Sequence, residues 1–191
     1  MTQPVPKSDL QWANPGALGL AAFGFSTMLL QLSNLGLITN VVPLVFGFFW
    51  AGVGQVIAGI IDGKRGDVFG LTAFTSYGLF WMALSSYFML QWFGVIPAAD
   101  LDGLGWMCII FAILSGCLAI GTFKMTKVHI FIFVSVTILF LLLAGHFFWD
   151  WSGKIPGVEG LICSASAIYG GIAVALNAKY QKTVCPMGVC K

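Results

Sequence analysis

Charged residues are scarce in this chain of 191 residues. Asp, Glu, Lys and Arg make up 8% of it, whereas a soluble domain carries ~25%. Five stretches contain none of them, namely 10–61, 68–99, 103–123, 128–149 and 160–178. Because ~20 apolar residues in an α-helix cross a ~30 Å hydrocarbon core, each stretch can span a bilayer, and the first can span it twice. The composition, 59% hydrophobic, therefore excludes an ordinary soluble fold.

Residues that carry enzymatic or metal chemistry are also few. The chain has two histidines, and its sequence shows no nucleophile–base pair and no cluster of metal ligands. Cys185 and Cys190 have a C-x4-C spacing, but a zinc site needs more ligands and no histidine is near. No basic run indicates nucleic acid. We expect a protein that is not an enzyme and uses no metal or cofactor, with these two cysteines in a free tail.

Six membrane-spanning helices are predicted. They cover roughly 16–34, 41–62, 70–93, 104–123, 128–148 and 158–179. Asn34, Gly36, Asn40 and Pro43 place the uncharged break between the first two, because such residues interrupt helices. The predicted class is an all-α integral membrane protein with a transmembrane domain over 16–180. The segments 1–15 and 181–191 lie outside it.

The positive charges predict the orientation. In a six-helix arrangement, eight of the nine Lys and Arg residues fall on the side of the two termini. The opposite side holds Lys154 with Asp100, Asp102, Asp150 and Glu159. Since Lys and Arg concentrate in cytoplasmic loops, we predict that both terminal segments are cytoplasmic and that the protein is a multi-pass protein of the plasma membrane.

A weak internal similarity links the third and sixth predicted helices. Gly70-Leu71 precedes Tyr77-Gly78, much as Gly160-Leu161 precedes Tyr169-Gly170. Two inverted halves of three helices, as found in many transporters, would produce this pattern. Chance similarity between two glycine-rich helices is the alternative.

Hydroxyls and amides interrupt the apolar stretches. Those singled out are Thr27, Gln31, Gln55, Thr72, Ser76, Ser166 and Asn177. Such groups can bond their own helix or a neighbouring one. Alternatively, they can line a water-filled path, because an unpaired polar group in lipid is costly. The first interpretation suits any single Ser or Thr, whereas both remain open for Gln31 and Gln55.

Groups that could relay protons inside the membrane are nearly absent. The candidates are His129 and His146, near opposite ends of one predicted helix, and Asp62 at the edge of another. Proton-coupled carriers usually place ionisable groups deeper in the membrane. A narrow path with hydroxyls, amides and an apolar constriction fits better. This argument favours a small amphiphilic solute and does not separate acetate from ammonia, glycerol or water.

Three motifs resemble those of the acetate uptake transporter family. Asn14-Pro15-Gly16-Ala17-Leu18-Gly19-Leu20 is similar to its N-P-A-P-L-G-L signature, with Ala17 in place of the second proline. Residues 69–78 read F-G-L-T-A-F-T-S-Y-G, as in the family. Residues 160–169 resemble its G-L-I-C-G-A-S-A-I-Y. The similarity runs along nearly the whole chain.

The resemblance implies a function and an assembly. It implies a hexamer of six-helix subunits in the lipid bilayer, each with its own path for acetate, succinate or another small carboxylate. It also implies an apolar constriction of Phe23, Tyr77 and Val136, with a wider neck than in the relative compared, which has Leu at the third position. Proton-coupled acetate symport and a channel for ammonia or a small neutral solute remain alternatives.

Asn14 is the remaining predicted site residue. Its side chain can cap free amides where the first helix begins. Those amides lie at the positive end of the helix and would attract a carboxylate. We predict that Asn14 lies at the cytoplasmic mouth of the path.

Overall fold

The computed structural model describes residues 12–96 and 100–189, which fold into one bundle of helices. The elements are α1 (Gly16–Asn34), α2 (Val41–Phe46), the π-helix η1 (Gly47–Val53), α3 (Gly54–Arg65), α4 (Val68–Trp92), α5 (Leu101–Thr122), α6 (Lys127–Trp149) and α7 (Lys154–Tyr180). Because α2, η1 and α3 run on without a break, the described residues form six helices long and apolar enough to cross a membrane. The predicted all-α class and number of spans are confirmed.

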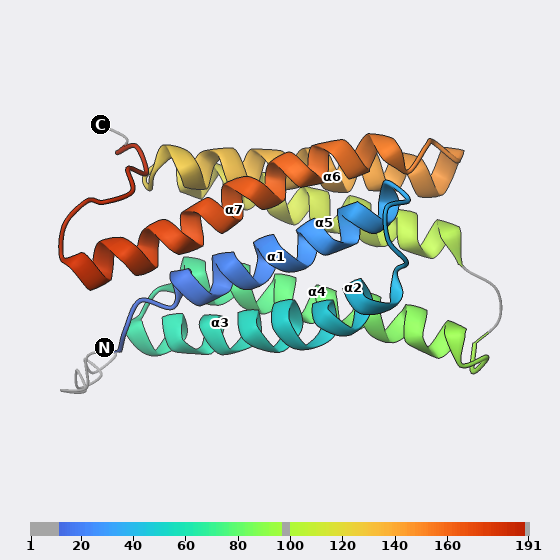
Figure 1. Ribbon diagram of the computed structural model, residues 1–191, viewed down its shortest axis with the longest axis horizontal. Coiled ribbons are helices and arrows are strands. Elements are labelled where there is room, and N and C mark those ends of the chain that lie inside the picture. The colour runs from blue at the N-terminus through green and yellow to red at the C-terminus, as the bar shows by residue number, and fades with distance from the viewer. Residues whose placement is uncertain (1–11, 97–99, 190–191) are drawn as a thin grey trace, which may run out of the picture.

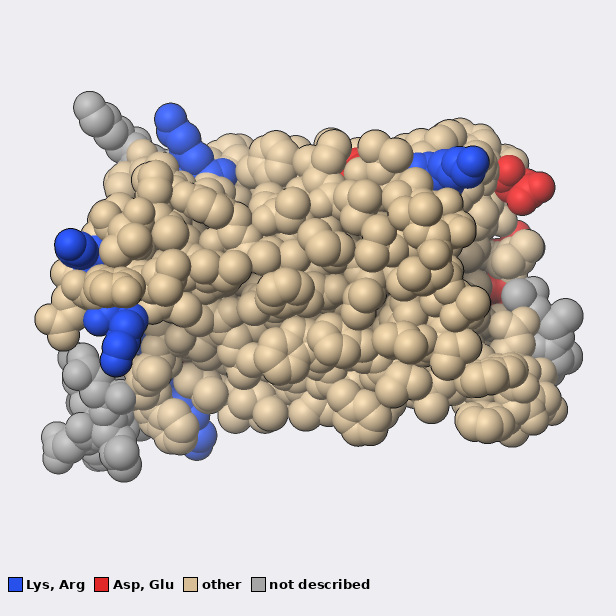
Figure 2. Space-filling model, viewed as in Figure 1, with Lys and Arg blue, Asp and Glu red and all other residues tan. Residues whose placement is uncertain are grey.

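The helices run along the long axis of the bundle (Figure 1). In this arrangement α1 packs on α7, α5 on α6, and α3 on α4. Helix α1 begins and α7 ends at the same end of the bundle (Figure 1). Most of the visible Lys and Arg lie at that end, whereas most of the visible Asp and Glu lie toward the other (Figure 2). Which end faces the cytoplasm stays a prediction, as does the inverted repeat.

Side-chain caps begin three of the helices. Asp67 Oδ1 accepts a hydrogen bond from Gly70 N at 3.0 Å, and Asp100 Oδ1 accepts one from Gly103 N at 2.8 Å. Thr126 Oγ1 accepts one from His129 N at 3.4 Å. Such caps satisfy amides that have no partner in the first turn of a helix. They begin α4, α5 and α6 one to three residues before the predicted starts.

A π-helical turn lies in the middle of the second span. Helix η1 covers Gly47–Val53, where α-helix was predicted. Here the span packs closely on α4, since a Cβ at Gly47 would lie 2.7 Å from the ring of Trp81. Trp81 is therefore buried against a residue that has no side chain.

The carboxyl-terminal tail is not free over its described part. Val184 N and Cys185 N both donate hydrogen bonds to Asn177 Oδ1, and Tyr169 Oη donates one to Pro186 O. The tail then reaches α6, where Lys127 N donates to Gly188 O at 2.7 Å. The prediction of a free tail is therefore wrong for residues up to 189. Cys190 lies outside the described residues, as do residues 1–11.

Candidate functional site

Two cavities lie one after the other inside the bundle. Cavity 1 has a volume of about 190 Å³ and reaches the end of the bundle at which α1 begins. Cavity 2 has a volume of about 260 Å³ and extends toward the opposite end, where Asn34 and His146 line it. Both volumes far exceed the ~15 Å³ that one water molecule requires. A small solute therefore has space at two levels of the bundle.

The two cavities share three lining residues, Phe23, Tyr77 and Val136. All three side chains are buried, and they come from α1, α4 and α6. The ring centroids of Phe23 and Tyr77 are 6.1 Å apart. We call these three residues the neck. They are the residues that the family resemblance implies for the constriction.

The ring of Tyr77 is held in a defined orientation. Its hydroxyl lies 2.8 Å from Ser115 Oγ. Ser115 Oγ donates its own hydrogen to Phe111 O at 2.6 Å, so Tyr77 must be the donor of the shared bond. The rings of Phe111, Phe133 and Phe140 surround it at centroid distances of 6.2 to 6.4 Å. Sequence analysis did not single out Ser115, because it lies on another helix, 38 positions away.

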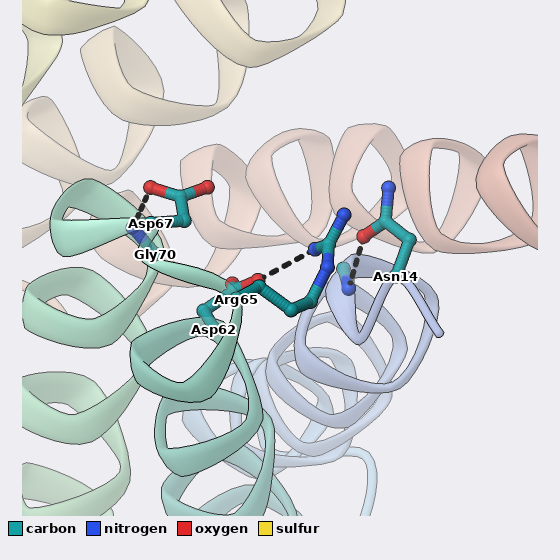
Figure 3. A network of polar contacts seen from close by, with 6 residues as sticks. Asn14, Asp62, Arg65, Asp67 and Gly70 are labelled. Carbon is teal, nitrogen blue, oxygen red and sulfur yellow. Dashed lines mark hydrogen bonds and ion pairs between the residues drawn. The ribbon is translucent and has the colours of Figure 1, made fainter. Parts of the chain in front are cut away.

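Among the described residues, Asp and Arg side chains line cavity 1, and no Asp, Glu, Lys or Arg lines cavity 2. Arg65 Nη1 donates a hydrogen bond to Asp62 Oδ1 at 2.8 Å, and Asp67 lies close by at the start of α4 (Figure 3). Asn14 also lines this cavity, and its Oδ1 accepts from Gly16 N at 2.8 Å. Its place at a cytoplasmic mouth stays a prediction. Deeper in the bundle, Gln55 is 1% exposed, and its Oε1 has no hydrogen-bond partner among the described residues.

Cavity 2 is lined mainly by apolar and aromatic side chains, with a few polar ones. Thr27 lines it, and the buried Thr27 Oγ1 has no partner in the described part of the chain. Gln31 also lines it, but its Oε1 accepts from Asn34 Nδ2 at 2.8 Å. Each cavity thus has one buried polar side chain with an unpartnered oxygen: Gln55 in cavity 1 and Thr27 in cavity 2.

Two of the predicted path residues on α4 line neither cavity. Thr72 is exposed on the outside of the bundle and Ser76 is half-buried. At 3.6 residues per turn, Thr72 lies ~140° and Ser76 ~100° around the helix from Tyr77. Because Tyr77 faces the neck, these two hydroxyls face away from it. Neither residue lines cavity 1 or cavity 2, so their place on the path is not supported by the two cavities and stays a prediction.

The two predicted path residues on α7 have structural partners instead. Ser166 Oγ donates to Cys163 O at 2.6 Å, a bond within its own helix. Asn177 uses both ends of its amide on the tail, since Asn177 Nδ2 donates to Cys185 O at 2.9 Å while its Oδ1 accepts from two tail amides. Neither residue lines either cavity. Both side chains therefore bond the backbone, and their role as path residues stays a prediction.

A carboxylate inside the bundle was missed. Glu159 was assigned by its charge to the side opposite the termini, and it lies in the second turn of α7, which begins at Lys154. Glu159 Oε1 accepts a hydrogen bond from Ser135 Oγ on α6 at 2.5 Å, and its buried Oε2 has no described partner. Glu159 is therefore a half-buried carboxylate inside the bundle, and it was not among the relay groups predicted from the sequence. Glu159 lines neither cavity.

Six spanning helices around two consecutive cavities define a polytopic membrane protein with space for a small solute along its axis. The chain belongs to the GPR1/FUN34/yaaH family, whose sequence profile matches residues 1–188.

Relatives in this family have described roles. The chain is 38% identical over 186 residues, 92% of its length and 95% of the relative's, to the succinate-acetate/proton symporter SatP of Escherichia coli K12. A solved structure described as the bacterial acetate channel SatP covers 93% of this chain and all of its own, with a TM-score of 0.90 and 38% identity. The ammonia transport outward protein 2 of Saccharomyces cerevisiae is 32% identical over 87% of this chain and 64% of its own length.

Proposed function

We propose that this chain carries acetate, and other short carboxylates such as succinate, across a membrane through a path within each subunit. The path runs from cavity 2 through the neck to cavity 1. The observation that carries the proposal is that the two cavities share only Phe23, Tyr77 and Val136. An apolar constriction of this kind excludes strongly hydrated ions and controls passage by dewetting. The likeness to SatP supports the choice of carboxylates.

Polar groups on both sides of the neck suit a small carboxylic acid or its anion. Gln55 lines cavity 1 and Thr27 lines cavity 2, each with a buried oxygen that has no described partner. The amide and hydroxyl hydrogens of these side chains can replace part of a solute's hydration without a fixed charge that would hold it. Gln31 offers a further amide in cavity 2.

The neck is tested by the selectivity of flux in proteoliposomes. Phe23→Ala widens an apolar constriction, so succinate flux is expected to rise relative to acetate flux. This ratio does not depend on the amount of folded protein. Phe25→Ala is the matched control, because Phe25 lies on the same helix, is exposed and lines neither cavity. Equal ratios in the wild type and both variants would exclude Phe23 from the constriction.

Proton-coupled transport is a second candidate, which Glu159 favours. Glu159 places within α7 the kind of carboxyl group that proton-coupled carriers use. Current in a planar bilayer separates the two mechanisms. A conducted anion gives a current that reverses at the equilibrium potential of acetate, whereas symport of one proton with one acetate gives no net current. Electroneutral flux that Glu159→Gln abolishes would establish symport.

Ammonia is the remaining candidate solute, since one relative is described as an ammonia transport protein. Both solutes can be followed in the same vesicles. If ammonia shares the path, excess ammonia will slow the entry of labelled acetate in proportion to its concentration. If acetate flux does not exceed that of protein-free vesicles while ammonia flux does, ammonia replaces the carboxylate as the proposed solute.

We also propose a hexamer in the plasma membrane. Support comes from the family resemblance and from the outer surface, where large apolar side chains such as Phe49, Ile113 and Ile120 are exposed. Lipid and neighbouring subunits are both suitable partners for such a surface. Native mass spectrometry from lipid nanodiscs is expected to give six copies of the 20.5 kDa chain. A monomer or dimer as the largest species would overturn this proposal.

A further inference from the structure

Arg65 is the one Lys or Arg among the described residues that line the two cavities. It is the last residue of α3, at the outer end of cavity 1. Its side chain is 31% exposed, so water and solute can reach it. A positively charged side chain at the mouth of a carboxylate path calls for a physical explanation.

Among the described residues, one hydrogen bond is found for the guanidinium of Arg65. It has five N–H donors, and the bond from Nη1 to Asp62 Oδ1 is the one side-chain contact found for it in the part of the chain that the structure describes. Figure 3 shows the group between Asp62 and Asn14, with its second terminal nitrogen turned away from Asp62. A planar guanidinium matches a carboxylate in geometry, and such a pair is stronger than a neutral hydrogen bond.

Asp62 is fixed in place by the packing of α3 on α4. It is buried, and a Cβ at Gly70 would lie 2.0 Å from Asp62 Oδ2. The absence of a side chain at Gly70 therefore makes the space in which this carboxylate sits. Asp67, the other acid of the cavity, accepts the Gly70 amide at the start of α4, where the positive end of the helix offsets its charge. Asp62, held 2.8 Å from Arg65 Nη1, is thus the counter-charge of Arg65.

We infer that Arg65 is the docking site for the solute's carboxylate at the mouth of cavity 1 and that Asp62 limits how long the solute stays there. This inference rests on the proposed function. A conducting site must bind well enough for solute to enter and weakly enough for it to leave. An Arg without a counter-charge would hold a carboxylate too long, whereas a neutral mouth would not concentrate it. The pair of Arg65 and Asp62 lies between these extremes.

The first test measures the concentration dependence of labelled acetate flux. In Arg65→Gln the half-saturating concentration is expected to rise about tenfold, because one charge-assisted contact is lost, while the maximal flux per folded protein is unchanged. Lys64→Gln is the matched control: it removes the same charge from the neighbouring residue, which is exposed and lines neither cavity. Arg65→Lys, which keeps the charge, is expected to restore most of the affinity.

The second test removes the counter-charge. Asp62→Asn keeps the shape and leaves Arg65 unneutralised, so the half-saturating concentration and the maximal flux are both expected to fall. If this variant does not fold, acetate binding to Arg65→Gln and to Lys64→Gln is compared in detergent instead. Binding is measured as the shift in melting temperature that acetate causes. A weaker shift in Arg65→Gln alone supports docking.

The outcomes separate the docking site from the transport function. If the wild type carries acetate, and Arg65→Gln and Lys64→Gln give the same curve of flux against acetate concentration, the docking site is overturned and the transport proposal stands. A wild type that moves no acetate above protein-free vesicles would overturn both. A rise in acetate affinity in Arg65→Gln would also overturn docking, because Arg65 would then act only as a clamp on Asp62.

Discussion

Removal of a single hydroxyl group is expected to change transport and stability in opposite directions in this protein. Thr27 Oγ1 is buried without a described partner and lines cavity 2. Thr27→Val keeps the shape and removes a buried polar group that bonds none of the described residues, so stability is expected to rise by ~1 kcal/mol. Acetate flux is expected to fall several-fold, because the solute loses a hydroxyl beside the neck. Melting in detergent and flux in proteoliposomes measure the two effects.

Ser26 supplies the control for Thr27. It is the preceding residue and is also buried with an unpartnered hydroxyl, but it lines neither cavity. Ser26→Ala is expected to match the effect on stability without the loss of flux. If both variants lowered flux equally, the effect would come from α1 packing, and Thr27 would have no place in the path.

The hydroxyl of Tyr77 has a different role from its ring. Tyr77→Phe removes the bond to Ser115 and keeps the aromatic ring at the neck. A loss of stability of ~1 kcal/mol is expected, as for a single buried hydrogen bond, with the flux ratio of succinate to acetate unchanged. Tyr77→Ala is expected to raise that ratio. If Tyr77→Phe alters selectivity as much as Tyr77→Ala does, then the hydroxyl itself contacts the solute.

At this scale the family resemblance was a better guide to cavity-lining residues than residue type was. Phe23, Tyr77 and Val136 came from the family resemblance and do line both cavities. Thr72 was proposed because its residue type suits a path, although its angular distance from Tyr77 was already given by helical periodicity. Asn177 could not have been assigned from sequence, because its partners are tail amides brought back to it by the fold.

At the scale of elements, the contacts of the carboxyl-terminal tail were not predicted from the sequence. Its carbonyls accept hydrogen bonds from Lys127 N and Val128 N, two amides in the first turn of α6, which no helical carbonyl can satisfy. Asn177→Ala removes three bonds that hold the tail. Hydrogen exchange at Lys127 and Val128 is expected to become at least about tenfold faster, since such local opening limits exchange. Mass spectrometry of the peptide at the start of α6 measures this.

Ser166→Ala is the matched control for this tail prediction. It removes a polar side chain from the same helix, but the bond that is lost lies within α7. Its exchange at the start of α6 should equal that of the wild type. If Asn177→Ala also shows the wild-type rate of hydrogen exchange at the start of α6, then Tyr169 and the backbone bonds hold the tail without Asn177.

Helix boundaries were predicted less well than helix number. The last helix was predicted to begin at residue 158, but α7 begins four residues earlier, at Lys154. Pro156 suits its first turn, because proline lacks the amide hydrogen that would have no partner there. This signal was present in the sequence. The π-helix η1 had no such signal, since it depends on the packing of Gly47 against Trp81.

For the whole molecule, length and hydropathy were enough to predict six spans, because each helix must satisfy its backbone hydrogen bonds within lipid. The burial of the neck and the position of Glu159 were not predictable in this way. They depend on which faces of α1, α4, α6 and α7 meet. Sidedness depends on the charges of the loops, and it determines which compartment cavity 1 faces.

Thiol labelling in intact cells tests the sidedness. Lys64, Arg65, Lys124 and Lys127 lie at the end where α1 begins, whereas Asp100, Asp102 and Lys154 lie at the other. Because positive loops stay in the cytoplasm, an impermeant maleimide is expected to label Asp102→Cys and to leave Lys124→Cys unlabelled until the cells are opened, both in a background without the native cysteines. Labelling of Lys124→Cys alone in intact cells would reverse the orientation. Arg65 would then meet solute that arrives from outside, so the same experiment decides whether the proposed docking site serves entry into the cell or exit from it.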